Sequence, residues 1–293
     1  MRDTHLIDCH AMSEFFQPKS LDEALSALAE TSFIPVAGGT DYYPPIAGRI
    51  VDDPILDLSR ITSLRGIEEI GTGWRIGATT TWSDICDTKL PPLFDCLKLA
   101  AQEIGGRQIQ NIGTIAGNIC NASPAADGVP VLMALEAQVE LASMGSVRSI
   151  PIDKFIIGNR RTAKKPSELV TSIYIPKPRP NHSSTFLKLG ARRYLVISIA
   201  MIAIALETDS KKEITSCRIA VGACSPVAQR LKELEEEIIG SKIGMSLSKV
   251  PIQSHFSNLS PIDDIRSTAT YRMEAAFTLV CRALDKVESA LSK

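Results

Sequence analysis

The pattern of apolar and polar positions predicts helices alternating with short strands over the first part of the chain. The run SLDEALSALAE opens with a capping-box pattern, Ser20 followed by Glu23, and repeats apolar residues at helical spacing, so a helix is expected to begin there. The short apolar run FIPVA ends at Gly38 and Gly39, which is typical of a buried strand that enters a glycine turn. Further strands are expected at 54–58, 74–78, 137–141 and 168–175, and further helices near 81–86, 93–103 and 127–135.

The pattern changes near residue 176. The segment PKPRPNHSS, residues 176–184, concentrates prolines and polar residues, as linkers do, so we place a domain boundary there. The apolar run 194–206 then predicts a buried strand, which a charged turn joins to a second strand at 214–223. Two more helices are expected, at 227–239 and at about 267–291. The expected domains are residues 1–176, with subdomains of about 1–58 and 59–176, and residues 185–293.

Length and charge exclude several classes of protein. At 293 residues the chain is long enough for two domains with cores of their own. Its 32 lysines and arginines nearly cancel 33 aspartates and glutamates, and no basic run is present, so nucleic acid is not an expected partner. The longest apolar run falls short of the roughly 20 residues that a membrane-spanning helix needs. The first residues lack a continuous apolar segment of the kind found in secretory signals, so we expect a cytoplasmic protein.

The cysteines and histidines predict no metal centre in this chain. Seven scattered cysteines without a CxxC pair suit reduced thiols, and they lack the spacing of a plant-type iron–sulfur site. If iron–sulfur chemistry is involved, another chain carries it. The four histidines lie outside the glycine-rich segments, and no GxSxG elbow is present, so a zinc enzyme or a hydrolase is not indicated.

Two segments of small residues form the candidate site. They are PVAGGTDYYPP, residues 35–45, and IQNIGTIAGNICNASPAADGVP, residues 109–130, and both are expected to be loops. Glycines with small neighbours let the backbone approach a ligand closely and offer N–H groups to an anion such as phosphate. For any one glycine a simple turn is the better explanation, but two such segments favour a ligand site. Neither has the spacing of a Rossmann fingerprint or a P-loop.

One carboxylate closes the second glycine segment. The hydroxyls of Thr114 and Ser123 and the amides of Asn118 and Asn121 precede Asp127, which lies near the expected start of a helix. Two roles are open for Asp127. It either caps that helix or accepts a hydrogen bond from a ligand hydroxyl.

Three motifs in a fixed order carry a resemblance to a known family. VAGGTD, then IGGRQIQNIGTIAGNICNASPAAD, then FLKLGARRYLVISIA resemble the FAD-binding medium subunit of the molybdenum hydroxylases, the xanthine dehydrogenase and carbon monoxide dehydrogenase family. The resemblance covers nearly the whole chain. It implies an α+β fold, in which a two-part FAD-binding domain of the vanillyl-alcohol-oxidase (PCMH) type precedes a smaller α+β C-terminal domain with an antiparallel sheet and helices.

The resemblance also implies a function and a set of partners. This chain would be the oxidoreductase flavoprotein that binds FAD, while a molybdopterin-binding large subunit and a small subunit with [2Fe-2S] clusters would hold the other cofactors. Electrons from substrate oxidised at molybdenum would pass through the clusters to FAD and then to an external acceptor, such as NAD or oxygen. The flavin does the redox chemistry, so neither a catalytic side chain nor a metal ligand is expected in this chain.

Carried over motif by motif, the resemblance names the residues expected to hold FAD. The N–H groups of residues 37–40 are the expected diphosphate contacts. Lys188 would offset negative charge on the cofactor. The full set is Pro35, Val36, Ala37, Gly38, Gly39, Thr40, Asp41, Tyr42, Ile104, Thr114, Ile115, Ala116, Gly117, Asn118, Ser123, Asp127, Leu169 and Lys188.

The chain departs from the family pattern at three places. Ile34 stands where relatives often have a lysine before the first glycine segment, which removes one potential positive charge. Ala116 stands where many relatives have glycine, which adds a methyl group near the cofactor. Arg192 and Arg193 lead into Tyr194 instead of acidic residues, which leaves the electron acceptor open. Tyr194 either covers the flavin ring or fills a core. Two alternative functions also stay open: a self-sufficient flavin-dependent reductase or oxidase of the same fold, and a non-catalytic protein with a degenerate cofactor site.

Overall fold

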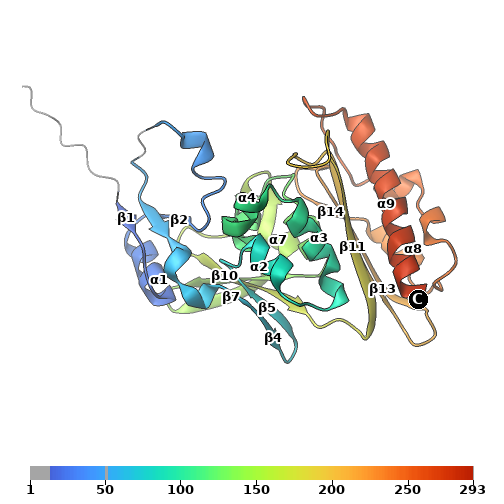
Figure 1. Cartoon of the computed structure of the whole chain (residues 1–293), viewed down its shortest axis with the longest axis horizontal. Coiled ribbons are helices and arrows are strands. Elements are labelled where there is room, and N and C mark those ends of the chain that lie inside the picture. The colour runs from blue at the N-terminus through green and yellow to red at the C-terminus, as the bar shows by residue number, and fades with distance from the viewer. Residues whose placement is uncertain (1–13, 50–51, 293) are drawn as a thin grey trace, which may run out of the picture.

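The computed structural model describes residues 14–49 and 52–292. The N-terminal residues considered above for a secretory signal, with Cys9 and His10 among them, lie outside the described part up to residue 13. The elements follow one another across the molecule in Figure 1, from a small sheet, through a central group of helices, to a sheet that is covered on its outer side by a long helix.

The small sheet is parallel and has the order β1-β3-β2. Its strands are β1 (Phe15–Phe16), β2 (Ile34–Val36) and β3 (Ile55–Asp57), and helix α1 (Leu21–Glu30) joins the first two. The predicted start of α1 is confirmed, since the Ser20 side chain accepts a hydrogen bond from the Glu23 N–H. The first glycine segment follows β2 directly and runs into a 3-10 turn (Pro44–Ile46). The edge of this sheet therefore positions that segment.

A five-stranded antiparallel sheet with the order β4-β5-β10-β6-β7 supports the central helices. Helix α2 begins with a full capping box between Thr81 and Asp84. The second glycine segment is mostly helical and not the loop that we expected. The strands are β4 (Ile67–Ile70), β5 (Gly73–Gly77), β6 (Gln138–Ser143), β7 (Ser146–Pro151) and β10 (Leu169–Pro176), with a separate pair, β8 (Ile156–Gly158) and β9 (Arg161–Thr162). The helices are α2 (Trp82–Asp87), α3 (Asp95–Glu103), α4 (Arg107–Ile112), α5 (Ile115–Asn121), α6 (Gly128–Ala134) and α7 (Ile152–Phe155).

The last sheet is a middle layer with both faces covered. Its antiparallel strands are β11 (Asn181–Leu189), β12 (Ala200–Thr208), β13 (Ile214–Gly222) and β14 (Gln229–Arg230). Along β12, Met201 and Ala203 join the core of the central helices, whereas Ile202 and Ile204 join the core under α8 (Lys232–Ile238) and α9 (Ala269–Ser292). A strand that is buried on both faces has no polar face, which explains the continuous apolar run in the sequence.

Three predicted boundaries differ from the structure. The strand expected at 194–206 begins only at Ala200, and the residues before it form a connection in which Tyr194 is 61% exposed, so Tyr194 fills no core. The helix expected at 227–239 begins at Lys232, because Gln229–Arg230 pairs with β13. The expected linker is shorter, because residues 181–184 belong to β11.

A buried arginine ties α9 to the beginning of β12. The Arg272 guanidinium donates hydrogen bonds to the backbone oxygens of Ile199, at 2.7 Å, and Ala223, at 3.1 Å, and to the carboxylate of Asp264, at 2.8 Å. Burial alone would raise the pKa of Asp264, but hydrogen bonds from the Arg266 N–H and from the Arg272 and Arg266 side chains lower it to about 2.

Asp264→Asn is expected to destabilise the protein at neutral pH and to matter less in acid. A carboxyl whose pKa falls from 3.8 to about 2 on folding contributes stability that is fully present above pH 3.8 and is lost as the pH falls toward 2. The difference in urea midpoint between wild type and variant should therefore shrink across that window. A difference that stays constant from neutral pH down to the low end of the window would contradict the lowered pKa.

Candidate functional site

The two glycine segments meet along one cleft of about 840 Å³. One wall comes from the segment after β2, and the facing wall comes from α4 and α5 with the residues around them. The lining residues are Pro35, Val36, Ala37, Gly38, Gly39, Thr40, Asp41, Tyr42, Pro45, Ile46, Trp82, Ile104, Gly105, Ile109, Gly113, Thr114, Gly117, Asn118, Cys120, Asn121, Arg160 and Ile197.

Two glycines allow this close approach for different reasons. A Cβ added to Gly38 would lie 2.5 Å from the carbonyl carbon of Ile112 and closer still to its oxygen, so the backbones of the two segments touch there. Gly39 has a φ of +65°, in the left-handed region that glycine adopts without steric cost, and a Cβ there would overlap the ring of Tyr43. The glycine pair is therefore required by the backbone geometry of the cleft.

The first segment offers a run of free main-chain donors, whereas several donors of the second segment are already used. Within the described residues, the N–H groups of residues 37–40 donate to no protein acceptor. In contrast, the N–H groups of residues 115–117 already donate to Thr80 O at 3.0 Å, Ala78 O at 3.3 Å and Thr114 Oγ1 at 3.1 Å. An anion in the cleft would therefore find its backbone donors in the first segment.

The second segment contributes a side-chain acceptor. Asn118 lines the cleft, and its Oδ1 is buried without a hydrogen-bond partner among the described residues. A buried oxygen in this state costs roughly 1–3 kcal/mol. Free main-chain donors on one wall and the polar Asn118 side chain on the other fit a polar cofactor with phosphate and hydroxyl groups.

Some of the predicted residues line the cleft, and others lie elsewhere. Pro35 to Tyr42, Ile104, Thr114, Gly117 and Asn118 line it. The remaining residues carried over from the family do not. Ile115 and Ala116 belong to the core of the central helices, Leu169 belongs to the core beneath α1, and Ser123 lies in a turn where its hydroxyl accepts from the Ala125 N–H.

Asp127 and Lys188 form a buried ion pair outside the lining. Lys188 Nζ lies 2.6 Å from Asp127 Oδ2, the Ser198 hydroxyl donates to Oδ1 at 2.5 Å, and both charged side chains are less than a tenth exposed. Burial raises the pKa of Asp127, and Lys188 opposes this. The capping role considered for Asp127 is wrong, because its side chain makes no bond to the helix that follows. The pair instead ties β11 and the start of β12 to α6.

Sequence reasoning missed several lining residues, and Arg160 is the most polar of them. Arg160 precedes β9, and its Nη1 lies 2.9 Å from Asp41 Oδ2 and 2.6 Å from Asn121 Oδ1. It is the first arginine in NRRT, and no local pattern distinguishes it from its neighbour Arg161. Trp82, Ile109 and Ile197 were missed as well, because nothing near them in the sequence marks a ligand site.

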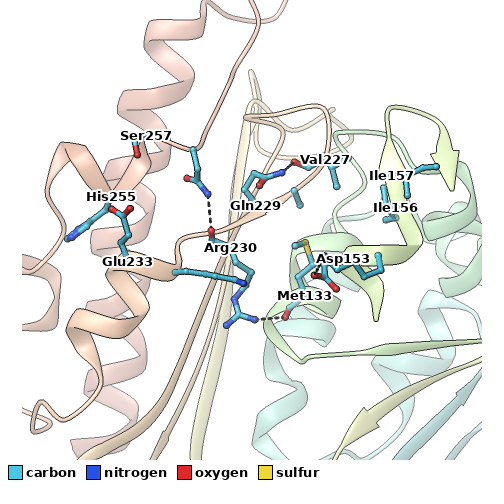
Figure 2. A pocket seen from close by; sticks show the side chains of 14 residues that line it. Met133, Asp153, Ile156, Ile157, Val227, Gln229, Arg230, Glu233, His255 and Ser257 are labelled. Atoms are coloured by element: carbon cyan, nitrogen blue, oxygen red, sulfur yellow. Dashed lines mark hydrogen bonds and ion pairs between the residues drawn. The ribbon is translucent and has the colours of Figure 1, made fainter. Parts of the chain in front are cut away.

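A second pocket of about 590 Å³ lies between α6, β8 and the segment around β14 (Figure 2). Arg230 occupies its centre, where Nη1 donates to Met133 O at 3.3 Å and the rest of the guanidinium pairs with Glu235. Its other charges balance in number, since Lys154 and Lys232 line it together with Asp153 and Glu233. None of the residues predicted from the sequence lines this pocket, so the glycine-lined cleft is the better candidate.

Among the helices of the described residues, none has both the length and the apolar character to cross a membrane. Within residues 14–49 and 52–292, no group of three or more histidine, cysteine, aspartate or glutamate side chains is placed to hold a metal ion.

Comparisons with known proteins identify the family. Residues 11–178 match the model of the FAD binding domain in molybdopterin dehydrogenase, and residues 185–287 match that of the CO dehydrogenase flavoprotein C-terminal domain. The glyceraldehyde dehydrogenase medium chain of Sulfolobus acidocaldarius is 32% identical over 93% of this chain and 97% of its own. The nicotinate dehydrogenase FAD-subunit of Eubacterium barkeri is 29% identical over 89% of this chain and 91% of its own.

The fold agrees with these matches. A chain of carbon monoxide dehydrogenase from Hydrogenophaga pseudoflava superposes with a TM-score of 0.85 at 27% identity, over 96% of this chain and 98% of that one. The predicted α+β architecture, a FAD-binding domain followed by a C-terminal domain of antiparallel sheet and helices, is confirmed. This chain belongs to the FAD-binding medium subunits of the molybdenum hydroxylases, a family of oxidoreductase flavoproteins.

Proposed function

We propose that this chain binds FAD in the glycine-lined cleft and acts as the electron-transfer subunit of a molybdenum hydroxylase. It accepts electrons from iron–sulfur clusters on a small subunit and passes them from FAD to an external acceptor, NAD or oxygen. One observation carries the proposal. The two segments of the FAD-binding family meet at a cleft that offers unpaired N–H groups on one wall and the polar Asn118 side chain on the other.

The two walls of the cleft bind different parts of the cofactor. The N–H groups of residues 37–40 bind the diphosphate, because they are free donors on a backbone without side-chain bulk. Asn118 Oδ1 accepts a hydrogen bond from a hydroxyl or ring N–H of the cofactor. Apolar side chains of the cleft, Ile104, Ile109 and Ile197 among them, exclude water from the rest of the bound cofactor. FAD, when bound, supplies the redox chemistry, and the protein fixes its orientation and access.

The remaining cofactors belong to other chains in this proposal. Relatives named as a medium chain and as a FAD-subunit are by name parts of larger assemblies. A molybdopterin-binding large subunit would oxidise the substrate, and an iron–sulfur small subunit would relay the electrons. We expect the assembly to be cytoplasmic. The connection that carries the exposed Tyr194 adjoins the cleft through Ile197, so it is well placed to control access of the acceptor.

The isolated chain is expected to bind FAD and to contain neither iron nor molybdenum. Among the described lining residues the charged side chains are Asp41 and Arg160, which pair with each other, so no acid–base set is present for substrate oxidation. Visible absorption tests whether FAD is bound, and metal analysis tests for iron and molybdenum. Substrate-dependent bleaching of the flavin tests whether the chain alone can oxidise substrate, when the isolated chain is compared with the chain mixed with its partner subunits.

Three outcomes separate the possible functions. Bleaching only after the partner subunits are added supports the proposal. Bleaching of the isolated, metal-free chain would favour the self-sufficient flavoenzyme instead. A folded chain that takes up no FAD would favour the third possibility, a non-catalytic protein with a degenerate cofactor site.

A further inference from the structure

The cleft contains a single positive charge among its described lining residues. That charge is Arg160, and the one negative charge in the lining is Asp41. The diphosphate of FAD adds negative charge to this cleft, so a cation close by would strengthen its binding. Lys188 is not available, because it is buried and paired with Asp127.

The backbone around Arg160 is held in an uncommon conformation. Arg160 has a φ of +53°, and Ala122, whose carbonyl accepts the Arg160 N–H at 2.8 Å, has a φ of +48°. Left-handed backbone in residues other than glycine costs about 1 kcal/mol or more, and it persists only where the surroundings enforce it. The strain places the arginine at the end of α5, beside the cleft.

The guanidinium spans the cleft and keeps donors free. Its Nη1 donates to Asp41 on one wall and to Asn121 on the other. Its Nε and Nη2 donate to no acceptor among the described residues. Asp41 directly follows the residues whose N–H groups are unpaired, so Arg160 is anchored at the end of that run of donors.

We propose that Arg160 is the cation that binds the diphosphate of the cofactor, with Asp41 and Asn121 holding it in place. This inference rests on FAD binding in the cleft and names a residue that the family motifs do not. Charge-assisted hydrogen bonds from a guanidinium to phosphate are strong and directional. The N–H groups of residues 37–40 and Arg160 together then form a complete diphosphate site.

The test uses Arg160→Ala and Arg160→Lys in the full chain, with Arg161→Ala as a matched control. Arg161 is the neighbouring arginine, is exposed, and does not line the cleft. Affinities for FAD, ADP and riboflavin are measured by titration, and folding is checked by thermal denaturation. Arg160→Ala should weaken FAD and ADP roughly ten- to thirtyfold, as the loss of a charged hydrogen bond does, and Arg160→Lys should recover part of this. Riboflavin lacks the diphosphate, so its affinity should not change.

Asp41→Asn separates a binding role from a purely structural one. It removes the ion pair with Arg160 but leaves the cation in place. If Arg160 only links the two walls, Asp41→Asn should weaken FAD as much as Arg160→Ala does. If Arg160 binds the diphosphate, Asp41→Asn should weaken FAD much less than Arg160→Ala does, because the cation is still present and Asn121 still holds it.

The failures of the two proposals are distinguishable. A wild-type chain that binds no FAD overturns the proposed function itself. A wild-type chain that binds FAD, with Arg160→Ala binding FAD and ADP equally well, overturns only the role of Arg160. An equal loss for riboflavin and FAD in a folded Arg160→Ala protein would also overturn it, since the arginine would then act on the shape of the cleft.

Discussion

Gly38→Ala is expected to be the most damaging single substitution in the cleft. The added methyl group would overlap the backbone carbonyl of Ile112, which cannot rotate away as a side chain can. The two glycine segments would have to separate, at a cost of about 3 kcal/mol or more in the free energy of unfolding. FAD affinity should fall at least about a hundredfold, because the donors on one wall and the acceptor on the other would no longer reach the same ligand. Urea denaturation and FAD titration measure the two effects.

Gly71→Ala provides the control for this substitution. It makes the same chemical change at a position where an added Cβ meets no heavy atom within 4 Å and the backbone φ is not in the left-handed region. Its stability should change by less than about 1 kcal/mol, and its FAD affinity should not change. A Gly38→Ala protein as stable and as fully loaded with FAD as Gly71→Ala would show that the walls do not need this contact.

Asp127→Ala is expected to destabilise the fold severely. Without its carboxylate, the buried Lys188 ammonium keeps a single acceptor among the described residues, the carbonyl oxygen of Glu103 at 3.2 Å. Leaving one partner of a buried ion pair alone costs roughly 3–5 kcal/mol. From the sequence alone, the expected result would be the loss of one ligand hydrogen bond. The buried pair makes the change in unfolding free energy the larger effect, and urea denaturation measures it.

Two comparisons make this result specific. Asp87→Ala breaks the exposed pair with Arg107, at 3.5 Å, and should cost less than about 1 kcal/mol. The double variant Asp127→Ala with Lys188→Met removes both buried charges and should regain much of the lost stability. If Asp127→Ala is no less stable than Asp87→Ala, then Lys188 does not depend on Asp127 in the folded protein.

The structural features that the sequence predicts correctly depend on residues close together in the chain. The start of α1 depends on Ser20 and Glu23, which are three residues apart, and the glycine turn after β2 depends on adjacent residues. Both are confirmed because short-range hydrogen bonds and backbone conformation decide them. The extended run up to Leu206 was predicted only in part, since an apolar run does not distinguish a buried strand from an exposed connection beside a cleft.

The roles that the sequence did not reveal depend on distant partners. Asp127 meets Lys188 and Ser198, which are 61 and 71 residues further along the chain, so a helix cap was as plausible as a buried ion pair. Arg160 reaches Asp41 across 119 residues, and no pattern around either residue indicates that contact. Tertiary packing decides such roles, and it overrides local preference.

The placement of the β11–β14 sheet has a consequence for how the chain could be divided. Two family models meet near the connection at 177–180, which invites a description as two separable modules. However, Met201, Ala203 and Phe186 complete the same core as the helices of the first module. A module that folds alone needs a core of its own. A protease nick in this connection would therefore leave two fragments held together by a shared interior, and each fragment made alone would expose the apolar face that it buries against the other.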